Sequence, residues 1–428
     1  MSGGARRGSR MSSRWLWVLG LVLRQIWFRA ALFSVFSVAL ALLAAFIAPY
    51  IPYEISTKIG SEAVDNILTI LASSMLAVTT FSLTAMVSVF AGVNSTITPR
   101  ATQLLVEDST AQNALSTFLG AFLFAIVGIC ALSTGIYGTS GRVILFVGTI
   151  IVIAVIVVTL LRWIGHLSSF GRVGSTIDRL ETVIRAATDR SGYSLSTAPV
   201  TSAPSPHKHP VLADRIGYVT HLDLGALEDL AGRLDCAIDV HVLPGTFVTT
   251  GRAIASLDRA DSRTEAEIRA AFTFDHHRQF DHDPRLGLIV LSEIASRALS
   301  PAVNDPGTAI AVLGSGVRVM AAFLEEGRSK PAFDAKVRLP SLFVGDLFDD
   351  LVRPIARDGA ALVEVAIKLQ RSLGELADMA PWVRGLLAYR AADAMARSEQ
   401  AMTFEADLEC VRAAYLAHWT GPSIPARH

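Results

Sequence analysis

The side chains best suited to chemistry in the membrane-type part of the chain are hydroxyls inside one long apolar segment. On a helical wheel of about 100° per residue, Thr69, Ser73, Thr80 and Thr84 share a narrow arc, and Ser88 lies close by. Hydroxyls on one stripe let helices pack closely and hydrogen-bond to each other, and they can replace part of an ion's hydration shell. The stripe therefore predicts either a packing face or the lining of a narrow polar path. We expect it to face protein or water, with neighbouring Leu71 and Leu83 toward lipid.

A second group of polar residues surrounds a turn near residue 300. Ser300-Pro301 ends one helix and Asp305-Pro306 begins the next, because proline restricts the residue before it and fits the first helical turn. Asn304 can cap or adopt a left-handed backbone, and Arg297 could pair with Asp305 or Asp283. The turn is either a simple cap or a site for a ligand or a neighbouring subunit. The candidate residues are Arg278, Asp283, Arg297, Ser300, Asn304 and Asp305.

The densest histidine and aspartate cluster precedes that turn. Asp275-His276-His277 and Asp281-His282-Asp283 contain groups that can bind a divalent metal, and a metal-bound water is a hydrolytic nucleophile. The strings are similar to signatures of metal phosphohydrolases, but those enzymes need further ligands on separated elements, and the sequence identifies none. We therefore favour an exposed polar loop, and we predict no metal, no cofactor and no enzymatic activity.

The elements that must position these groups begin with four apolar segments. A spanning helix needs about 20 apolar residues, and the segments that satisfy this are Phe28–Ala48, Val64–Gly92, Ala114–Ile136 and Val143–Trp163. None has an ionisable residue at its centre, whereas coupled pumps usually carry one there. The segments therefore predict a passive conduit or a plain membrane anchor.

Charge placement predicts the orientation. Residues 1–29 contain six arginines and no acid. Arginine and lysine are enriched in the segments that flank a membrane on its cytoplasmic side. An even number of spans places both termini in the cytoplasm. The formal net charge is zero and the three cysteines form no metal or disulfide pattern, so the chain is no nucleic-acid binder as a whole and suits a reducing compartment.

The expected organisation has five parts: a basic N-terminus (1–26), a four-span domain (27–166), a helical extension of the fourth span (167–190), a Pro/Ser-rich linker (191–210) and a cytoplasmic α+β domain (211–428). In the last part, Ala237–Leu243 and Phe247–Val248 are expected to form a hairpin around Pro244-Gly245. The pattern from Ser262 onward is helical, beginning with Thr264–Phe274. The fold class is an all-α four-helix membrane domain followed by an α+β domain.

Several strings are similar to those of the bacterial "predicted membrane proteins" with domain of unknown function 2254. The strings are Ile97-Thr98-Pro99-Arg100, Leu104-Leu105, Asp108, Phe118-Leu119-Gly120, Gly245, Phe247-Val248, Gly251, Arg278, Asp283-Pro284, Gly287-Leu288, Ile294-Ala295, Arg297 to Pro301, Asn304-Asp305-Pro306 and Thr308-Ala309. The family typically has serine where this chain has Thr98, and phenylalanine where it has Leu286. His276, His277 and His282 do not belong to the family pattern.

The resemblance covers most of residues 20–400 and implies an inner-membrane protein with four spans and a cytoplasmic domain. It implies no activity. From the residues we expect a protein of the bacterial inner membrane that contacts the lipid bilayer, associates with itself and forms a channel-like or transport-related assembly regulated by its cytoplasmic domain. A membrane-anchored signalling or scaffold protein is the first alternative, and a membrane-tethered metal phosphohydrolase is the second.

Overall fold

The computed structural model describes residues 61–101, 108–134, 139–169, 171–191, 193–199, 208–329 and 336–419, with scattered positions between 28 and 39. These residues form two compact units. One, which we call the apolar unit, contains the helices up to residue 172. The other, the C-terminal unit, contains residues 96–98 and everything from 173 onward. The predicted basic N-terminus and nearly all of the predicted span Phe28–Ala48 lie outside the described residues.

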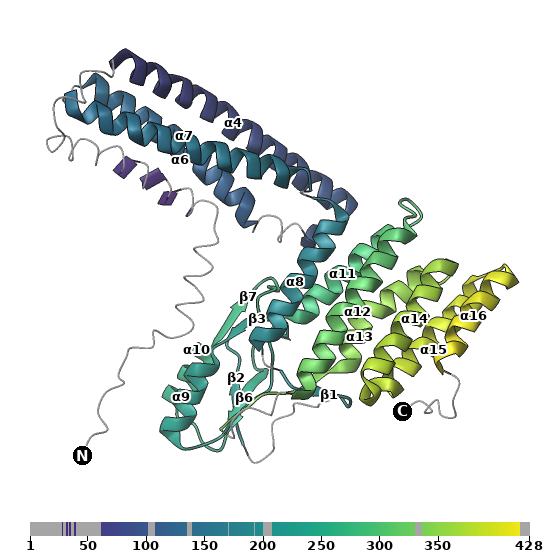
Figure 1. Cartoon of the computed structure of the whole chain (residues 1–428). Helices are drawn as coiled ribbons and strands as arrows, with labels where there is room; N and C mark the ends of the chain where they lie inside the picture. The colour runs from purple at the N-terminus through teal and green to yellow at the C-terminus, as the bar shows by residue number, and fades with distance from the viewer. Residues whose placement is uncertain are drawn as a thin grey trace. The chain divides into compact units, whose positions relative to one another are not determined.

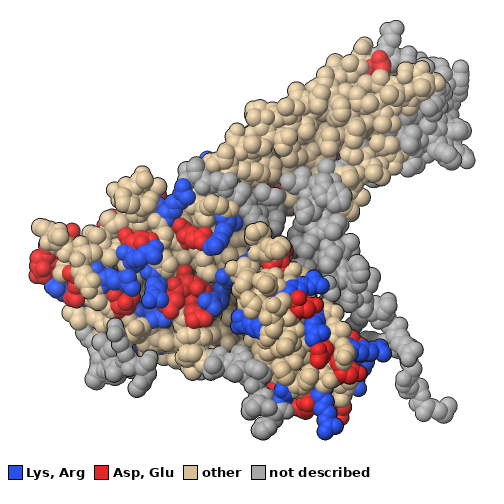
Figure 2. Space-filling model, turned by 180° about the vertical axis from the view of Figure 1, so that it is seen from behind, with Lys and Arg blue, Asp and Glu red and all other residues tan. Residues whose placement is uncertain are grey.

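Three long helices make up the described part of the apolar unit: α4 (Ser61–Thr96), α6 (Ser109–Ser133) and α7 (Thr139–Leu167), with the short turn η2 (Pro99–Ala101). They match the second, third and fourth predicted spans, and each is long and apolar enough to cross a membrane. The face of this unit in Figure 2 carries almost no charged side chain. Such a surface suits lipid rather than water.

Gly128 allows these three helices to pack close to one another. A Cβ at Gly128 of α6 would lie 3.1 Å from Leu68 of α4 and 3.5 Å from Leu145 of α7. Small residues at such crossings let backbones come close in a bilayer. Asp108 fixes the start of α6 by accepting a hydrogen bond from the Ala111 amide at 2.8 Å.

By length and composition alone, α12 (Pro306–Ser329) is the fourth candidate for a span. It belongs to the C-terminal unit, where it packs against α8, α11 and α14. A helix with neighbours on several sides is apolar around most of its surface. Burial among other helices therefore explains its apolar sequence.

The helix α8 (Val173–Ser191) is a separate helix, because α7 already ends at Leu167. Between them Gly171 has a left-handed backbone with φ of +77°, a conformation that glycine adopts without a steric penalty. Its apolar residues recur at three- and four-residue steps, and Ile177, Leu180 and Ile184 are all buried. This face packs against α11 and α12 of the C-terminal unit.

Three small sheets and two helices form one part of the C-terminal unit (Figure 1). The strand orders are β2-β6-β4-β8, β5-β3-β7 and β1-β9. The strands are β1 (Leu195–Ser196), β2 (His209–Leu212), β3 (Gly217–Leu222), β4 (Ile238–Val240), β5 (Phe247–Val248), β6 (Ala253–Leu257), β7 (Phe272–Asp275), β8 (Val337–Arg338) and β9 (Leu342–Phe343). The four-stranded and three-stranded sheets, together with α9 (Leu224–Leu234) and α10 (Ser262–Ala270), enclose an apolar core.

The sheets differ from the sequence expectation in three places. β5 pairs with β3 rather than with β4, because the Gly245 amide donates to the Val219 carbonyl and turns the chain toward β3. The expected helix Thr264–Phe274 ends at Ala270, and β7 follows. Part of the expected linker 191–210 is ordered in β1 and β2, because backbone ladder bonds need no apolar side chains.

Helices from α11 to α16 form the rest of the C-terminal unit and lie side by side in Figure 1. They are α11 (Pro284–Ala298), α12, α13 (Val344–Asp358), α14 (Val363–Met379), α15 (Arg384–Ala401) and α16 (Glu405–Trp419). The last three pack on one another, and a Cβ at Gly374 of α14 would overlap the His418 ring of α16. The glycine therefore permits this close crossing.

Candidate functional site

The helix α11 brings together stretches that are far apart in the sequence. The loop after α4 reaches it through Thr98, the turn before β5 reaches it through Gly245, and α8 reaches it through Ile184. These are the same stretches, apart from α8, that carry the family resemblance. The resemblance strings therefore converge on one element of the C-terminal unit, and this helix is the centre of the candidate site.

A buried ion pair fixes the beginning of α11. Arg278 donates two hydrogen bonds to Asp283, from Nε at 2.7 Å and from Nη2 at 2.9 Å. The same carboxylate caps the helix by accepting from the Leu286 amide at 3.2 Å. Gly245, with φ of +91°, leaves room for it, since a Cβ there would overlap the carboxylate. Burial, followed by the charge of Asp283, raises the pKa of the nearby Tyr193.

A hydrogen bond joins the loop after α4 to the middle of α11. The Thr98 hydroxyl donates to Oε2 of Glu293 at 3.0 Å, across 195 positions of sequence. Thr98 is 5% exposed, so little water competes for this bond. The bond needs only a hydroxyl donor, which serine would supply equally.

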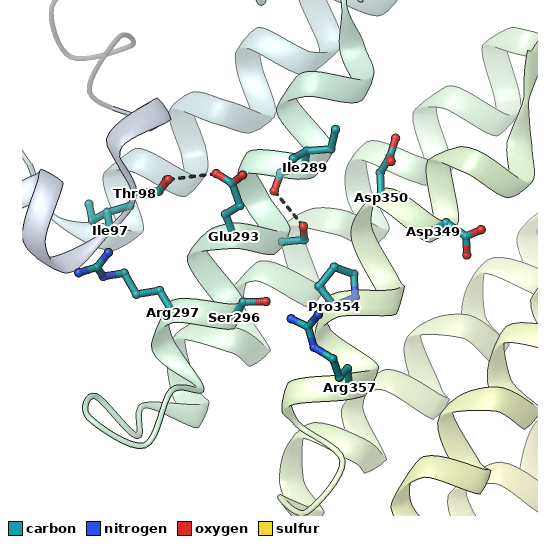
Figure 3. A pocket seen from close by; sticks show the side chains of 11 residues that line it. Ile97, Thr98, Ile289, Glu293, Ser296, Arg297, Asp349, Asp350, Pro354 and Arg357 are labelled. Carbon is teal, nitrogen blue, oxygen red and sulfur yellow. Dashed lines mark hydrogen bonds between the residues drawn. The ribbon is translucent and has the colours of Figure 1, made fainter.

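A pocket of about 520 Å³ opens beside this bond, between α11, α13 and residues 97–98 (Figure 3). On α11 the lining residues recur every three or four positions and thus share one face. The lining residues are Ile97, Thr98, Ile289, Ser292, Glu293, Ser296, Arg297, Asp349, Asp350, Pro354 and Arg357. The pocket therefore lies within the C-terminal unit, next to the contact of the α4 loop.

The charges around the pocket are separated along its length. Asp349 and Asp350 lie toward one end, and Arg297 and Arg357 lie toward the other (Figure 3). Asp349 is paired with Arg390 at 2.8 Å and Arg357 with Asp358 at 2.6 Å, so these charges are largely neutralised within the protein. The guanidinium of Arg285 donates to both oxygens of Asp350, at 2.6 and 3.2 Å. Burial raises the pKa of Asp350 despite this pair. The carboxylate therefore lies in a poorly hydrated environment.

The turn at the end of α11 is built as the sequence indicated. Asn304 has a left-handed backbone with φ of +50°. Asp305 accepts hydrogen bonds from the Thr308 amide at 3.1 Å and from the Thr308 hydroxyl at 2.6 Å, and these bonds hold the pKa of its carboxyl below the ordinary value. Asp305 is exposed, and its contacts are those of a helix cap.

The structure divides the six candidate residues of the sequence analysis into two groups. Arg278 and Asp283 lie at the start of α11, whereas Arg297 and the turn lie at its end, about 20 Å away for a helix of this length. The two acids suggested as partners of Arg297 have other partners: Asp283 pairs with Arg278, and Asp305 bonds to Thr308. Only Arg297 of the six lines the pocket. The role of the turn as a ligand site stays a prediction.

The acids of the histidine-rich stretch are engaged in the fold. Asp275 accepts from Gln279 at 3.1 Å, Asp281 pairs with Arg190 at 3.2 Å, and the His282 ring packs on that of His221 with centroids 4.8 Å apart. Among the described residues, no three or more His, Cys, Asp or Glu side chains gather where they could share a metal ion. The geometry therefore gives the phosphohydrolase alternative no support.

The hydroxyl stripe lies on an exposed face of α4. Ser73, Thr80 and Thr84 each donate to a carbonyl one turn earlier in the same helix, at 3.0, 2.9 and 2.9 Å. These internal bonds satisfy the hydroxyls without an external partner, so the stripe could face lipid at little cost. Leu71, which we expected toward lipid, is instead 7% exposed and packed inside the apolar unit.

Sequence reasoning missed several residues of the pocket. One signal was a group of polar residues at helical spacing on an otherwise apolar helix: Ser292, Glu293 and Ser296. This pattern indicates a helix face that needs polar partners. Pro354 inside α13 was a second signal, because an interior proline removes one helical hydrogen bond. Neither signal could show which helix lies opposite, since that depends on tertiary packing.

The apolar helices and the mixed C-terminal unit define the class: a predicted membrane protein with several apolar helices and a mixed α/β region. The chain matches the family model described as predicted membrane protein, domain of unknown function 2254, over residues 24–375, and it belongs to that family. Uncharacterized proteins of Mycobacterium bovis and Mycobacterium tuberculosis are 26% identical over 181 residues. That match covers 39% of this chain and 34% of each relative. No solved structure matches.

Proposed function

We propose that this protein is a channel-like or transport-related assembly of the bacterial inner membrane, in which the C-terminal unit lies in the cytoplasm and regulates the membrane helices. The proposal includes self-association, and it places both termini in the cytoplasm on the basis of the arginine distribution. Its support is a single contact, the hydrogen bond from Thr98 to Glu293.

The regulatory part of the proposal follows from chain connectivity. Residues 96–98 belong to the C-terminal unit, yet they continue directly from α4 of the apolar unit. A force applied to Thr98 is therefore transmitted covalently to the end of α4. A change at Glu293 that alters the Thr98 bond would thus favour one conformation of the end of α4 over another. A local change of contacts shifts an equilibrium between two conformations in this way.

The test compares two matched threonine variants of the full chain reconstituted in lipid vesicles. Thr98→Val removes the inter-element bond, whereas Thr182→Val removes only an exposed bond within α8, from the hydroxyl to the Asp178 carbonyl. We expect ion or solute flux through the wild type, a several-fold change with Thr98→Val and no change with Thr182→Val. Equal flux for the two variants would refute regulation through Thr98.

A wild-type protein that conducts nothing would favour the anchored signalling or scaffold alternative. Orientation is tested separately with reporter fusions after residues 55 and 190. Periplasmic activity of the fusion after residue 190 would contradict the cytoplasmic placement of the C-terminal unit.

A further inference from the structure

The turn between α11 and α12 has an apolar tip that faces outward. Pro301, Ala302 and Val303 are all exposed, and Val303 is 48% exposed. Water is an unfavourable neighbour for three consecutive apolar residues. The helix cap at Asp305 explains how α12 begins, but it does not require apolar residues before it. The tip is therefore suited to contact with an apolar partner.

The path of α8 indicates what lies near the tip. Glu181 of α8 accepts a hydrogen bond from Ser315 of α12, and Arg185 donates to the Arg318 carbonyl, so the two helices run in parallel. Eight residues back along each helix, α8 reaches its first residue, Val173, and α12 reaches its first turn, next to the apolar tip. The chain enters α8 from α7, which is long and apolar enough to cross a membrane. One membrane-type helix therefore joins the C-terminal unit at this end.

The connection from α4 reaches the same end. Thr98 bonds to Glu293 in the second half of α11. Figure 3 shows Ile97 beside Arg297, which belongs to the last turn of α11. The helix α4 ends at Thr96, immediately before these loop residues. A second membrane-type helix therefore leaves the C-terminal unit beside the turn that follows α11.

These two connections limit how far the tip can be from lipid. Leu167 ends α7 and Val173 begins α8, and six steps of chain span at most about 20 Å. Residues 96–98 follow α4 without any linker. A short tether keeps two surfaces at a high effective concentration. When α4 and α7 cross a bilayer, the apolar tip is thus held close to the surface of that bilayer.

The backbone of the turn is prepared for a region with little water. The amides of Ser300, Val303, Asn304 and Asp305 donate to carbonyls of α11 and of the turn, at 2.8 to 3.2 Å. Pro301 has no amide hydrogen. Backbone groups without a partner are costly in a lipid environment, so this internal bonding makes insertion less unfavourable.

We propose that the turn inserts Pro301, Ala302 and Val303 into the lipid leaflet nearest the C-terminal unit. The carboxylate of Asp305 is bonded to Thr308 and exposed, so it remains at the level of the lipid head groups, in water. An acid there does not attract anionic lipid, and the hydrophobic effect is the driving force. The inference goes beyond the proposed function, because an anchored scaffold protein would use the same contact as a channel.

The experiment measures the depth of a nitroxide label on the turn, with the full chain in lipid nanodiscs. The native cysteines are first replaced by alanine, and the label is then attached to Ala302→Cys. His277→Cys is the control position, because it is exposed in the loop before α11, at the other end of that helix. Oxygen concentrates in lipid, whereas a nickel chelate concentrates in water. We expect the label at 302 to collide mainly with oxygen and the label at 277 mainly with the nickel chelate.

Variants of Val303 test the cause. Val303→Asp places a charge at the tip and should lower the ratio of oxygen to nickel collisions at the 302 label several-fold, because a charge is unfavourable in lipid. Val303→Leu keeps an apolar side chain and should leave this ratio equal or higher. Both should melt like the parent protein, because Val303 is exposed. High salt should not change the ratio, and a fall would show that charged groups, rather than the apolar tip, hold the turn.

Three further results would overturn the inference. Equal access of the nickel chelate to the labels at 302 and 277 would place the tip in water. Protection of the 302 label from both reagents would mean that protein, such as a second copy of the chain, covers it. An equal ratio in Val303→Asp and Val303→Leu would remove the role of the apolar side chain. These results do not depend on the flux measured for Thr98→Val, so this inference and the proposed function can fail separately.

Discussion

The crossing of α8 and α11 depends on the absence of a side chain at Gly287. A Cβ placed there would overlap Cγ1 and Cδ1 of Ile184, which is 1% exposed in the core between the helices. Gly287→Ala must therefore push α8 away or force Ile184 from its rotamer. Overpacking of this kind costs about 1–3 kcal/mol, although the better helix propensity of alanine offsets up to about 1 kcal/mol of it.

Ile184→Ala alone should cost about 2–5 kcal/mol because it leaves a cavity. The double variant places the new methyl group of residue 287 in that cavity. We therefore expect its destabilisation to be smaller than the sum of the two single effects by about 1 kcal/mol or more, within the range for contacting residues. The melting temperature should shift by about 2–4 °C for each kcal/mol.

Thermal unfolding of the purified full chain, followed by circular dichroism, measures all three variants. Gly232→Ala serves as the matched control, since Gly232 lies in α9 with no atom within 4 Å of its added Cβ. That change should raise the melting temperature slightly. Additive effects of Gly287→Ala and Ile184→Ala would refute the reasoning, because they would mean that the two positions do not share one packing space.

Two further predictions concern carboxylates. Burial alone would raise the pKa of Glu181, but hydrogen bonds from Arg318 and Ser315 outweigh it and lower the pKa. The stability that it contributes is thus present above its ordinary pKa and lost as pH falls through the lowered value. Glu181→Gln should therefore melt below the wild type at pH 7, and the gap should close only once the pH falls below the lowered pKa. A gap that stays equal throughout an acid titration would contradict this. Asp305→Ser should melt like the wild type, because serine can also cap the helix. Asp305→Ala should lose about 1 kcal/mol of stability, because alanine cannot cap. A loss of assembly by Asp305→Ser with normal melting would instead show that the charge of Asp305 itself is used.

The sequence predicted local structure well where the signal is local. Apolar spacing located α4, α6 and α7, and proline with aspartate located the beginning of α12. Asn304 was expected to accept a left-handed backbone and does so. The hydrogen-bonding of these elements is determined by nearby residues, so a single sequence contains the information.

Contacts between distant segments could not be predicted in the same way. Nothing in the sequence near Thr98 indicates that its partner is Glu293, and nothing near Asp350 indicates Arg285. Arg297 was matched to Asp305 or Asp283, whereas Asp283 is held by Arg278 and Asp305 bonds to Thr308. Polar residues on helices acquire their partners from tertiary packing, which depends on the whole set of apolar faces.

The crossing of α14 and α16 affects where the chain can be cut for separate expression. The family match ends at residue 375, inside α14, whereas Leu408 and Val411 of α16 share a small apolar core with Ala366 of that helix. A fragment ending at 375 would lose four residues of α14 and uncover that core. The smallest fragment of the C-terminal unit suitable for refolding or crystallisation therefore extends through residue 419, and limits taken from the family match would yield an aggregating product.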